Sequence, residues 1–158
     1  MNNVLTPELQ ARVVGHLLGD MRAATNRKDR STFHLRFVQQ DSHKDYVLDT
    51  FEAFRPYCSQ QEIKQQKNLS WYFITRQLEV FSYLGRLFYP IHEKVVPKNI
   101  GDLLTDRGLA YWFMDDGSQM NSLRGIYFAT QSFTEEDVLL LIKCLNDKFQ
   151  LKATIQQI

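Results

Sequence analysis

Hydrophobic residues recur along the chain first at helical and then at strand spacing. Residues 7–19 have apolar side chains at intervals of three or four positions, the spacing of one helical face. Thr6 and Pro7 mark the start of that helix, because threonine caps free amide groups and proline suits a first turn. Alternating apolar and polar residues predict strands. In the first half we expect helices over residues 7–19, 43–55 and 77–88, and strands over residues 21–27, 31–40, 61–66 and 69–75.

The same order restarts after a stretch interrupted by proline and glycine. Residues 89–104 contain two prolines and Gly101 and are interpreted as a linker. Thr105 and Thr134 each precede an apolar helical pattern and are expected to cap it, as Asp41 or Ser42 is expected to cap the helix over residues 43–55. In the second half we expect helices over residues 105–116 and 134–148, and strands over residues 118–120, 125–131 and 151–158.

These elements predict an α+β fold of two pseudo-symmetric αββαββα repeats. The first repeat is expected over residues 1–88 and the second over residues 105–158, with residues 89–104 between them. The second repeat then lacks its last strand and last helix. A strand edge and part of an apolar sheet face are left for a protein or RNA partner, or for a longer chain, to cover.

Composition excludes some classes of protein, and charge distribution adds a candidate surface. No apolar run approaches the roughly 18 residues of a membrane-spanning helix, and the two cysteines have no metal-binding spacing. The net charge is only +1, yet basic residues gather on the predicted strands and turns of the first repeat. These charges are either ordinary solvated surface or candidates for nucleic-acid binding: Arg22, Arg27, Lys28, Arg30, Arg36, Lys64, Lys67 and Arg76.

Each repeat ends its first apolar helix in an acid, an unfavourable place for a negative charge because helix carboxyl ends are themselves negative. The first acid is Asp20, and the second is Asp116. Gly15 and Gly19 would let a second helix approach closely, with Ala110 expected on that helix. If the helices pack, the two acids meet, and their repulsion calls for a divalent cation such as Mg²⁺. Metal-assisted phosphodiester hydrolysis uses such a site, whereas the alternative is a pair of simple helix-ending turns.

Five segments resemble one known family, the LAGLIDADG homing endonucleases, in their single-chain, two-repeat, intron-encoded branch. Residues 13–21 and 109–117 resemble the two signature helices of that family, and the second copy is the more specific match. Residues 129–134 and 146–149 are similar to the same branch, as are residues 94–97 in the linker. Met21 departs from the pattern, since a small residue usually follows the first acid.

The resemblance implies a DNA-cutting enzyme whose antiparallel sheets form a saddle over double-stranded DNA. It implies that Asp20 and Asp116 are catalytic metal ligands, with two or three divalent ions, expected to be Mg²⁺, shared between them when DNA is bound. Lys94 matches a catalytic lysine. Asp115 stands where the first copy has Gly19, so Asp116 is the expected essential acid. The habits of the family also imply an organellar location, in a mitochondrion or plastid.

A second function is compatible with the same residues. A protein of this origin can instead act as an RNA-binding factor, either an intron maturase or a component of an organellar ribonucleoprotein, that holds structured RNA through shape and phosphate contacts. The incomplete second repeat favours this alternative, because it shortens the DNA saddle and makes the expected active site asymmetric. Loss of cutting in Asp20→Asn or Asp116→Asn would favour the nuclease.

Overall fold

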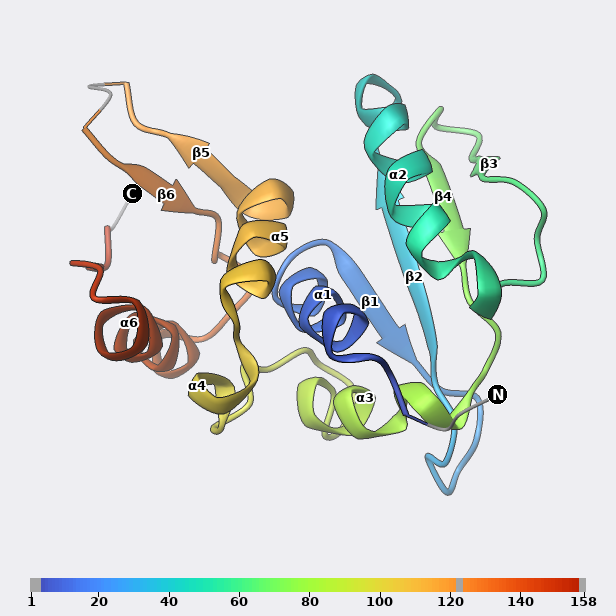
Figure 1. The fold of residues 1–158 in the computed structure, drawn as a ribbon, viewed down its shortest axis with the longest axis horizontal. Helices are drawn as coiled ribbons and strands as arrows, with labels where there is room; N and C mark the ends of the chain where they lie inside the picture. The colour runs from blue at the N-terminus through green and yellow to red at the C-terminus, as the bar shows by residue number, and fades with distance from the viewer. Residues whose placement is uncertain (1–3, 122–123, 157–158) are drawn as a thin grey trace.

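Two helices stand side by side at the centre of the fold, with strands on either side (Figure 1). The computed structural model describes residues 4–121 and 124–156. The central helices are α1 (Pro7–Leu18) and α5 (Asp106–Asp116). The Thr6 and Thr105 side chains accept amide protons at the starts of α1 and α5, as predicted, with N···O distances of 3.2 Å each. Such a cap stabilises a helix by about 1 kcal/mol.

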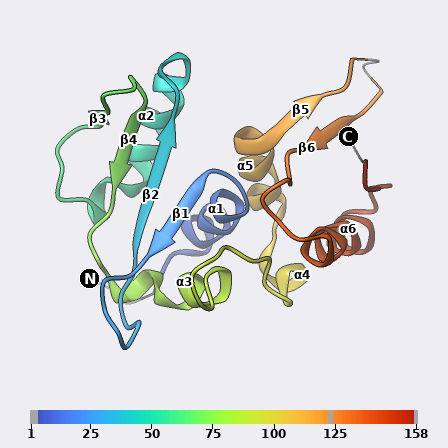
Figure 2. The same ribbon diagram turned by 180° about the vertical axis from the view of Figure 1, so that it is seen from behind.

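A four-stranded antiparallel sheet lies on the α1 side, in the order β1-β2-β4-β3. Helix α2 covers one of its faces, and α3 packs beside β1 (Figures 1 and 2). Short 3₁₀ turns precede or follow these helices. The elements of this half are β1 (Met21–Ala24), β2 (His34–Gln39), α2 (Lys44–Phe54), β3 (Lys64–Gln65), β4 (Trp71–Ile74) and α3 (Ser82–Phe88).

Alternation along these strands decides which sheet face is buried. Leu35, Phe37 and Phe73 point to the covered face and are fully buried. The rings of Phe51 and Phe54, from α2, lie with their centroids 5.5 and 5.8 Å from that of Phe73. Aromatic rings at this separation add to the stabilisation from burial. The core therefore fixes α2 on one face and leaves the other face of the sheet to solvent.

The second half repeats the start of the first on the α5 side (Figure 2). Strands β5 (Gly117–Gln119) and β6 (Ile126–Phe128) form an antiparallel pair, and α6 (Glu135–Phe149) follows. The Trp112 ring of α5 stacks on Phe128 of β6 at a centroid distance of 3.9 Å. A short helix, α4 (Ile100–Leu103), lies in the predicted linker and contacts α6. The α-β-β-α order expected of both repeats is present.

Two local predictions were wrong. Neither Asp41 nor Ser42 caps α2, because a 3₁₀ turn occupies residues 41–43 and the Asp41 carboxylate accepts a bond from the Trp71 indole N–H at 2.6 Å. The strand expected over residues 151–158 is absent from residues 151–156, and its last two residues lie outside the described ranges. The third threonine cap is confirmed, since Thr134 accepts from the Asp137 amide at 3.2 Å. The division into residues 1–88, 89–104 and 105–158 stays a prediction.

Candidate metal centre and nucleic-acid interface

Glycines bring the backbones of α1 and α5 into direct contact. A Cβ atom built on Gly15 would lie 2.2 Å from the carbonyl oxygen of Gly108, far inside van der Waals contact. Gly108 is less confined but still tightly packed, with its own Cβ position 3.0 Å from the carbonyl oxygen of Ala11. The close approach expected from Gly15 is present, but its partner is Gly108 and not Ala110. The contact aligns the carboxyl ends of both helices.

The two acids at these helix ends meet. Asp20 follows α1, Asp116 is the last residue of α5, and their carboxyl groups lie close enough that the charge of Asp20 raises the pKa of Asp116. Desolvation, the charge of Asp20 and that of Asp115 raise the pKa of Asp116 to about 8. The pKa of Asp20 is also raised, by desolvation first and then by Asp115, although Gln39 Nε2 donates to its Oδ2 at 2.7 Å. Burial and like charge thus both oppose the ionisation of these carboxyl groups.

Lys94 lies at the same helix ends. Its Nζ donates to the carbonyl oxygens of Gly19 and Met21, both at 2.9 Å, so it is hydrogen-bonded to the backbone on either side of Asp20. Burial lowers the pKa of Lys94 to about 8, against the opposing pull of the Asp116 and Asp20 carboxylates. The predicted linker thus places the Lys94 ammonium group near the carboxyl groups of Asp20 and Asp116.

Sequence reasoning did not find every polar group at this junction. The Asp115 side chain is fully buried and accepts bonds from three groups of the first repeat, among them His16 and Tyr46. His16 lies at the helix interface and is also fully buried. Gln39 and Tyr46 carried no sequence signal, because each reaches the junction only through the packing of β2 and α2 against α1.

The donor set suits a hard divalent cation completed by other ligands. Within residues 4–121 and 124–156, no cluster of three or more His, Cys, Asp or Glu side chains has metal-binding geometry. Two carboxylates alone match Mg²⁺, which typically takes one or two carboxylates and fills its remaining positions with water and phosphate oxygens. A cation would also relieve the repulsion that raises the pKa of Asp116. The residues present therefore fit the predicted metal, and their role as its ligands stays a prediction.

Three of the predicted basic residues share the solvent face of the first sheet. Arg22 on β1 lies directly opposite Arg36 on β2, and Lys64 on β3 lies opposite Tyr72 on β4. The Arg36 guanidinium lies over the Tyr72 ring, 5.1 Å from its centroid. This face is the one that α2 leaves uncovered, so its cations are available to a polyanion. We call these three residues, Arg22, Arg36 and Lys64, the basic sheet face.

The other predicted basic residues lie at the rim or hold the fold together. Arg27, Lys28 and Lys67 are exposed in turns. Arg30 donates to the carbonyl oxygens of Tyr89 and Ile91.

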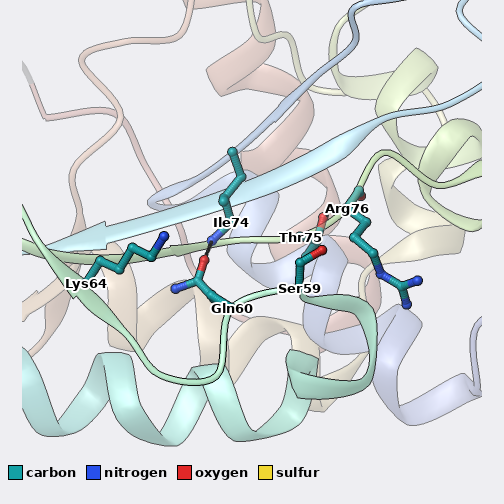
Figure 3. A pocket seen from close by; sticks show the side chains of 6 residues that line it. All are labelled: Ser59, Gln60, Lys64, Ile74, Thr75 and Arg76. Atoms are coloured by element: carbon teal, nitrogen blue, oxygen red, sulfur yellow. Dashed lines mark hydrogen bonds between the residues drawn. The ribbon is translucent and has the colours of Figure 1, made fainter.

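Arg76 lies past the end of β4 and not within a strand. It donates to the carbonyl oxygens of Pro56, at 2.9 Å, and Tyr57, at 3.4 Å. A shallow hollow separates it from Lys64, as Figure 3 shows, with Gln60 between them and bonded to the Ile74 amide. The Arg76 guanidinium is thus held by hydrogen bonds to main-chain carbonyls, whereas the Lys64 side chain is exposed to solvent.

Residues 11–158 match the model of the LAGLIDADG DNA endonuclease family, which is nearly the whole chain. The chain belongs to this family. This match and the solved structures reported below confirm the family and the fold predicted from the sequence.

Relatives of two named kinds match this LAGLIDADG chain. A cytochrome b mRNA maturase, bI2, of Debaryomyces hansenii is 30% identical over 99% of the chain and 62% of its own length. A probable intron-encoded endonuclease of Wickerhamomyces canadensis is 30% identical over 91% of the chain and 67% of its own length. The chain therefore spans about two thirds of the length of these relatives.

Solved structures show the same fold. The homing endonuclease I-WcaI, determined bound to its DNA recognition sequence, has a TM-score of 0.85 and 29% identity over 97% of this chain and 72% of its own. I-DmoI, at 11% identity and a TM-score of 0.51 over 89% of this chain and 76% of its own, shares the fold alone. In residues 4–121 and 124–156, the structure contains no helix with the length and apolarity to cross a bilayer.

Proposed function

We propose that this chain acts as a site-specific endonuclease that cuts double-stranded DNA with a divalent metal, Mg²⁺ in the cell. The observation that carries the proposal is geometric: α1 and α5 are in backbone contact, the Asp20 amide donates to Asp115, and Asp116 is the next residue, at the end of α5. Similarity to I-WcaI, a homing endonuclease solved with its DNA recognition sequence, supports the same substrate. The similarity to a probable intron-encoded endonuclease supports the same activity.

The site residues have separate tasks in this proposal. Asp20 and Asp116 hold the metal, which when bound polarises the scissile phosphate and lowers the pKa of a water ligand. Lys94 keeps its ammonium group beside these acids with a pKa of about 8, where it offsets phosphate charge and exchanges a proton near neutral pH.

DNA is placed by the basic sheet face. Arg22, Arg36 and Lys64 extend from the solvent face of one sheet, and such side chains bind phosphates or guanine edges in a major groove. Arg27, Lys28 and Lys67 extend this surface through exposed turns. Arg30 and Arg76 serve the fold instead, through their bonds to main-chain carbonyls.

Cleavage of a matched duplex tests the proposal. The substrate is a duplex carrying the uninterrupted locus into which the reading frame is inserted, incubated with Mg²⁺ and then with EDTA. We expect a double-strand cut that EDTA abolishes and that Asp20→Asn and Asp116→Asn each reduce at least 100-fold. Asp102→Asn, an exposed acid on α4, is the matched control and should cut normally. Undiminished cutting by both site variants would overturn the proposal.

The second candidate is RNA binding. The maturase of Debaryomyces hansenii, which matches 99% of this chain, favours it. In that case the chain binds its intron RNA tightly, Asp20→Asn and Asp116→Asn leave that affinity unchanged, and no duplex is cut. A filter-binding titration of intron RNA against a scrambled RNA of equal length separates the two functions.

We further propose an organellar setting. Relatives include a maturase of cytochrome b messenger RNA and intron-encoded endonucleases. A reading frame within a mitochondrial or plastid intron supports this location, and a free-standing nuclear gene contradicts it.

A further inference from the structure

Asp115 and Gly19 fit each other across the contact between the two repeats. A Cβ atom on Gly19 would lie 2.5 Å from the Cβ and 2.6 Å from the Oδ2 of Asp115. The Asp115 side chain therefore occupies the space that any residue larger than glycine would need at position 19. The two repeats differ at this equivalent position for a steric reason, because only one of the two can carry a side chain.

The carboxylate of Asp115 holds the backbone of the neighbouring acid. Its Oδ2 accepts from the amide N–H of Asp20 at 3.1 Å and from the His16 Nδ1–H at 3.0 Å. Its Oδ1 accepts from the Tyr46 hydroxyl. All three donors belong to the first repeat, whereas Asp115 belongs to α5 of the second. A fully buried carboxylate with three donors is held in one orientation.

A second row of side chains fixes the donors themselves. Arg12 Nε–H donates to His16 Nε2 at 3.2 Å, which places the remaining imidazole proton on Nδ1, facing Asp115. The Arg12 guanidinium also donates to the Tyr111 hydroxyl at 3.1 Å and lies 4.2 Å from the centroid of that ring. Arg12 therefore aligns His16, and His16 aligns Asp115.

We infer that Asp115 is a positioning residue that fixes the metal ligand Asp20 across the repeat interface. The inference rests on the proposed function, because it takes Asp20 to be a metal ligand. Asp115 acts through the Asp20 amide and touches neither metal nor DNA in this account. Only Asp20 is positioned in this way. Gly19, the counterpart of Asp115 in the first repeat, has no side chain with which to hold Asp116.

Asp115→Ala and Asp115→Asn test this inference with two readouts. Alanine removes all three bonds, whereas asparagine keeps an acceptor oxygen for His16 and Asp20 and offers an amide to the Tyr46 hydroxyl. In Asp115→Ala, we expect the hydrogen-exchange rate of the Asp20 amide, measured by NMR without metal, to be at least 10-fold higher than in the wild type. We also expect it to raise the Mg²⁺ concentration for half-maximal cutting about 10- to 100-fold. In Asp115→Asn, both the exchange rate and the Mg²⁺ requirement should stay close to the wild-type values.

A pair of tyrosine variants keeps the test valid if Asp115→Ala fails to fold. Tyr46→Phe removes one donor to Asp115, and Tyr83→Phe removes an exposed hydroxyl on α3 that bonds neither Asp115 nor its donors. The Mg²⁺ requirement should rise in the first and stay normal in the second. Equal values in both, or unchanged Asp20 exchange in folded Asp115→Ala, would overturn the inference. Full cutting by Asp20→Asn would instead overturn the proposed function.

Discussion

Asp116 is placed where a carboxylate is least favoured, at the carboxyl end of a helix, beside a second acid and partly removed from water. These conditions act in the same direction, and together they raise the pKa of its carboxyl group to about 8. Lys94 opposes them with a positive charge whose own pKa is lowered by burial. Such an arrangement destabilises the metal-free protein, and it is typical of a site kept for chemistry.

Asp116→Asn should stabilise the metal-free protein at neutral and alkaline pH. The folded-state pKa lies above the unfolded value of 3.8, so the wild type gives up stability as pH rises from about 4 to 8. Asparagine has no proton to lose, so its advantage should grow over that interval and reach about 1 kcal/mol, or 2–4 °C in Tm. Thermal unfolding in EDTA at pH 4, 6 and 8 measures it.

Millimolar Mg²⁺ is the control for this prediction. Because the cation binds the folded wild type, it should raise the Tm of the wild type and leave Asp116→Asn unchanged. An advantage for Asp116→Asn that stays constant from pH 4 to 8 would contradict the pKa assigned to Asp116.

At the scale of elements, the α1–α5 contact decides where both acids lie. Backbone touches backbone at Gly15 and Gly108, so no flexible side chain lies between the helices that could move to accommodate a larger residue. A shift between the helices would separate Asp20 from Asp116 and Gly19 from Asp115 together. Stability and site geometry thus depend on the same two glycines.

Gly15→Ala should lower the free energy of unfolding by about 2–3 kcal/mol, since its methyl group overlaps the Gly108 carbonyl. The expected fall in Tm is at least about 4 °C. Gly101→Ala is the matched control, because nothing lies within 4 Å of its Cβ position. It should unfold no earlier than the wild type, and a loss as large as that of Gly15→Ala would contradict the tight contact. Urea denaturation compares the three proteins.

Local signals predicted the elements well, and contacts between elements were predicted less well. The caps at Thr6, Thr105 and Thr134 involve residues three positions apart, so the sequence contains all their partners. Asp41 failed as a cap because Trp71, thirty positions away, competes for its carboxylate. The strand expected over residues 151–158 is absent from residues 151–156, because a strand needs a neighbour and no described strand pairs with them.

At the scale of the whole molecule, a near-neutral chain presents a localised positive surface. The net charge is +1, while the basic sheet face places three cations on the solvent face of one sheet. The sequence showed which strands carry these charges, because alternation assigns residues to faces. It did not show that Arg30 and Arg76 are tied to main-chain carbonyls, because those carbonyls lie in distant segments.

Binding to a non-specific duplex should depend on salt through this face. Arg22→Ala and Arg36→Ala should each reduce the slope of log affinity against log salt by about 1, because each releases about one counterion fewer. Arg107→Ala is the control, exposed on α5 about 14 Å along the helix from Asp116. Fluorescence anisotropy from 50 to 200 mM KCl gives the slopes, and equal slopes for the three variants would exclude the sheet face.

The central claim is that Asp20 and Asp116 hold one shared metal site, and iron-directed cutting of the polypeptide tests it most directly. Fe²⁺ replaces Mg²⁺ in the protein with a non-specific duplex, and ascorbate with peroxide then cleaves the chain beside the bound ion. We predict fragments ending near residues 20, 94 and 116, absent from Asp20→Asn and Asp116→Asn and retained in Asp102→Asn. Fragments that end elsewhere, or that persist in both site variants, would contradict the account.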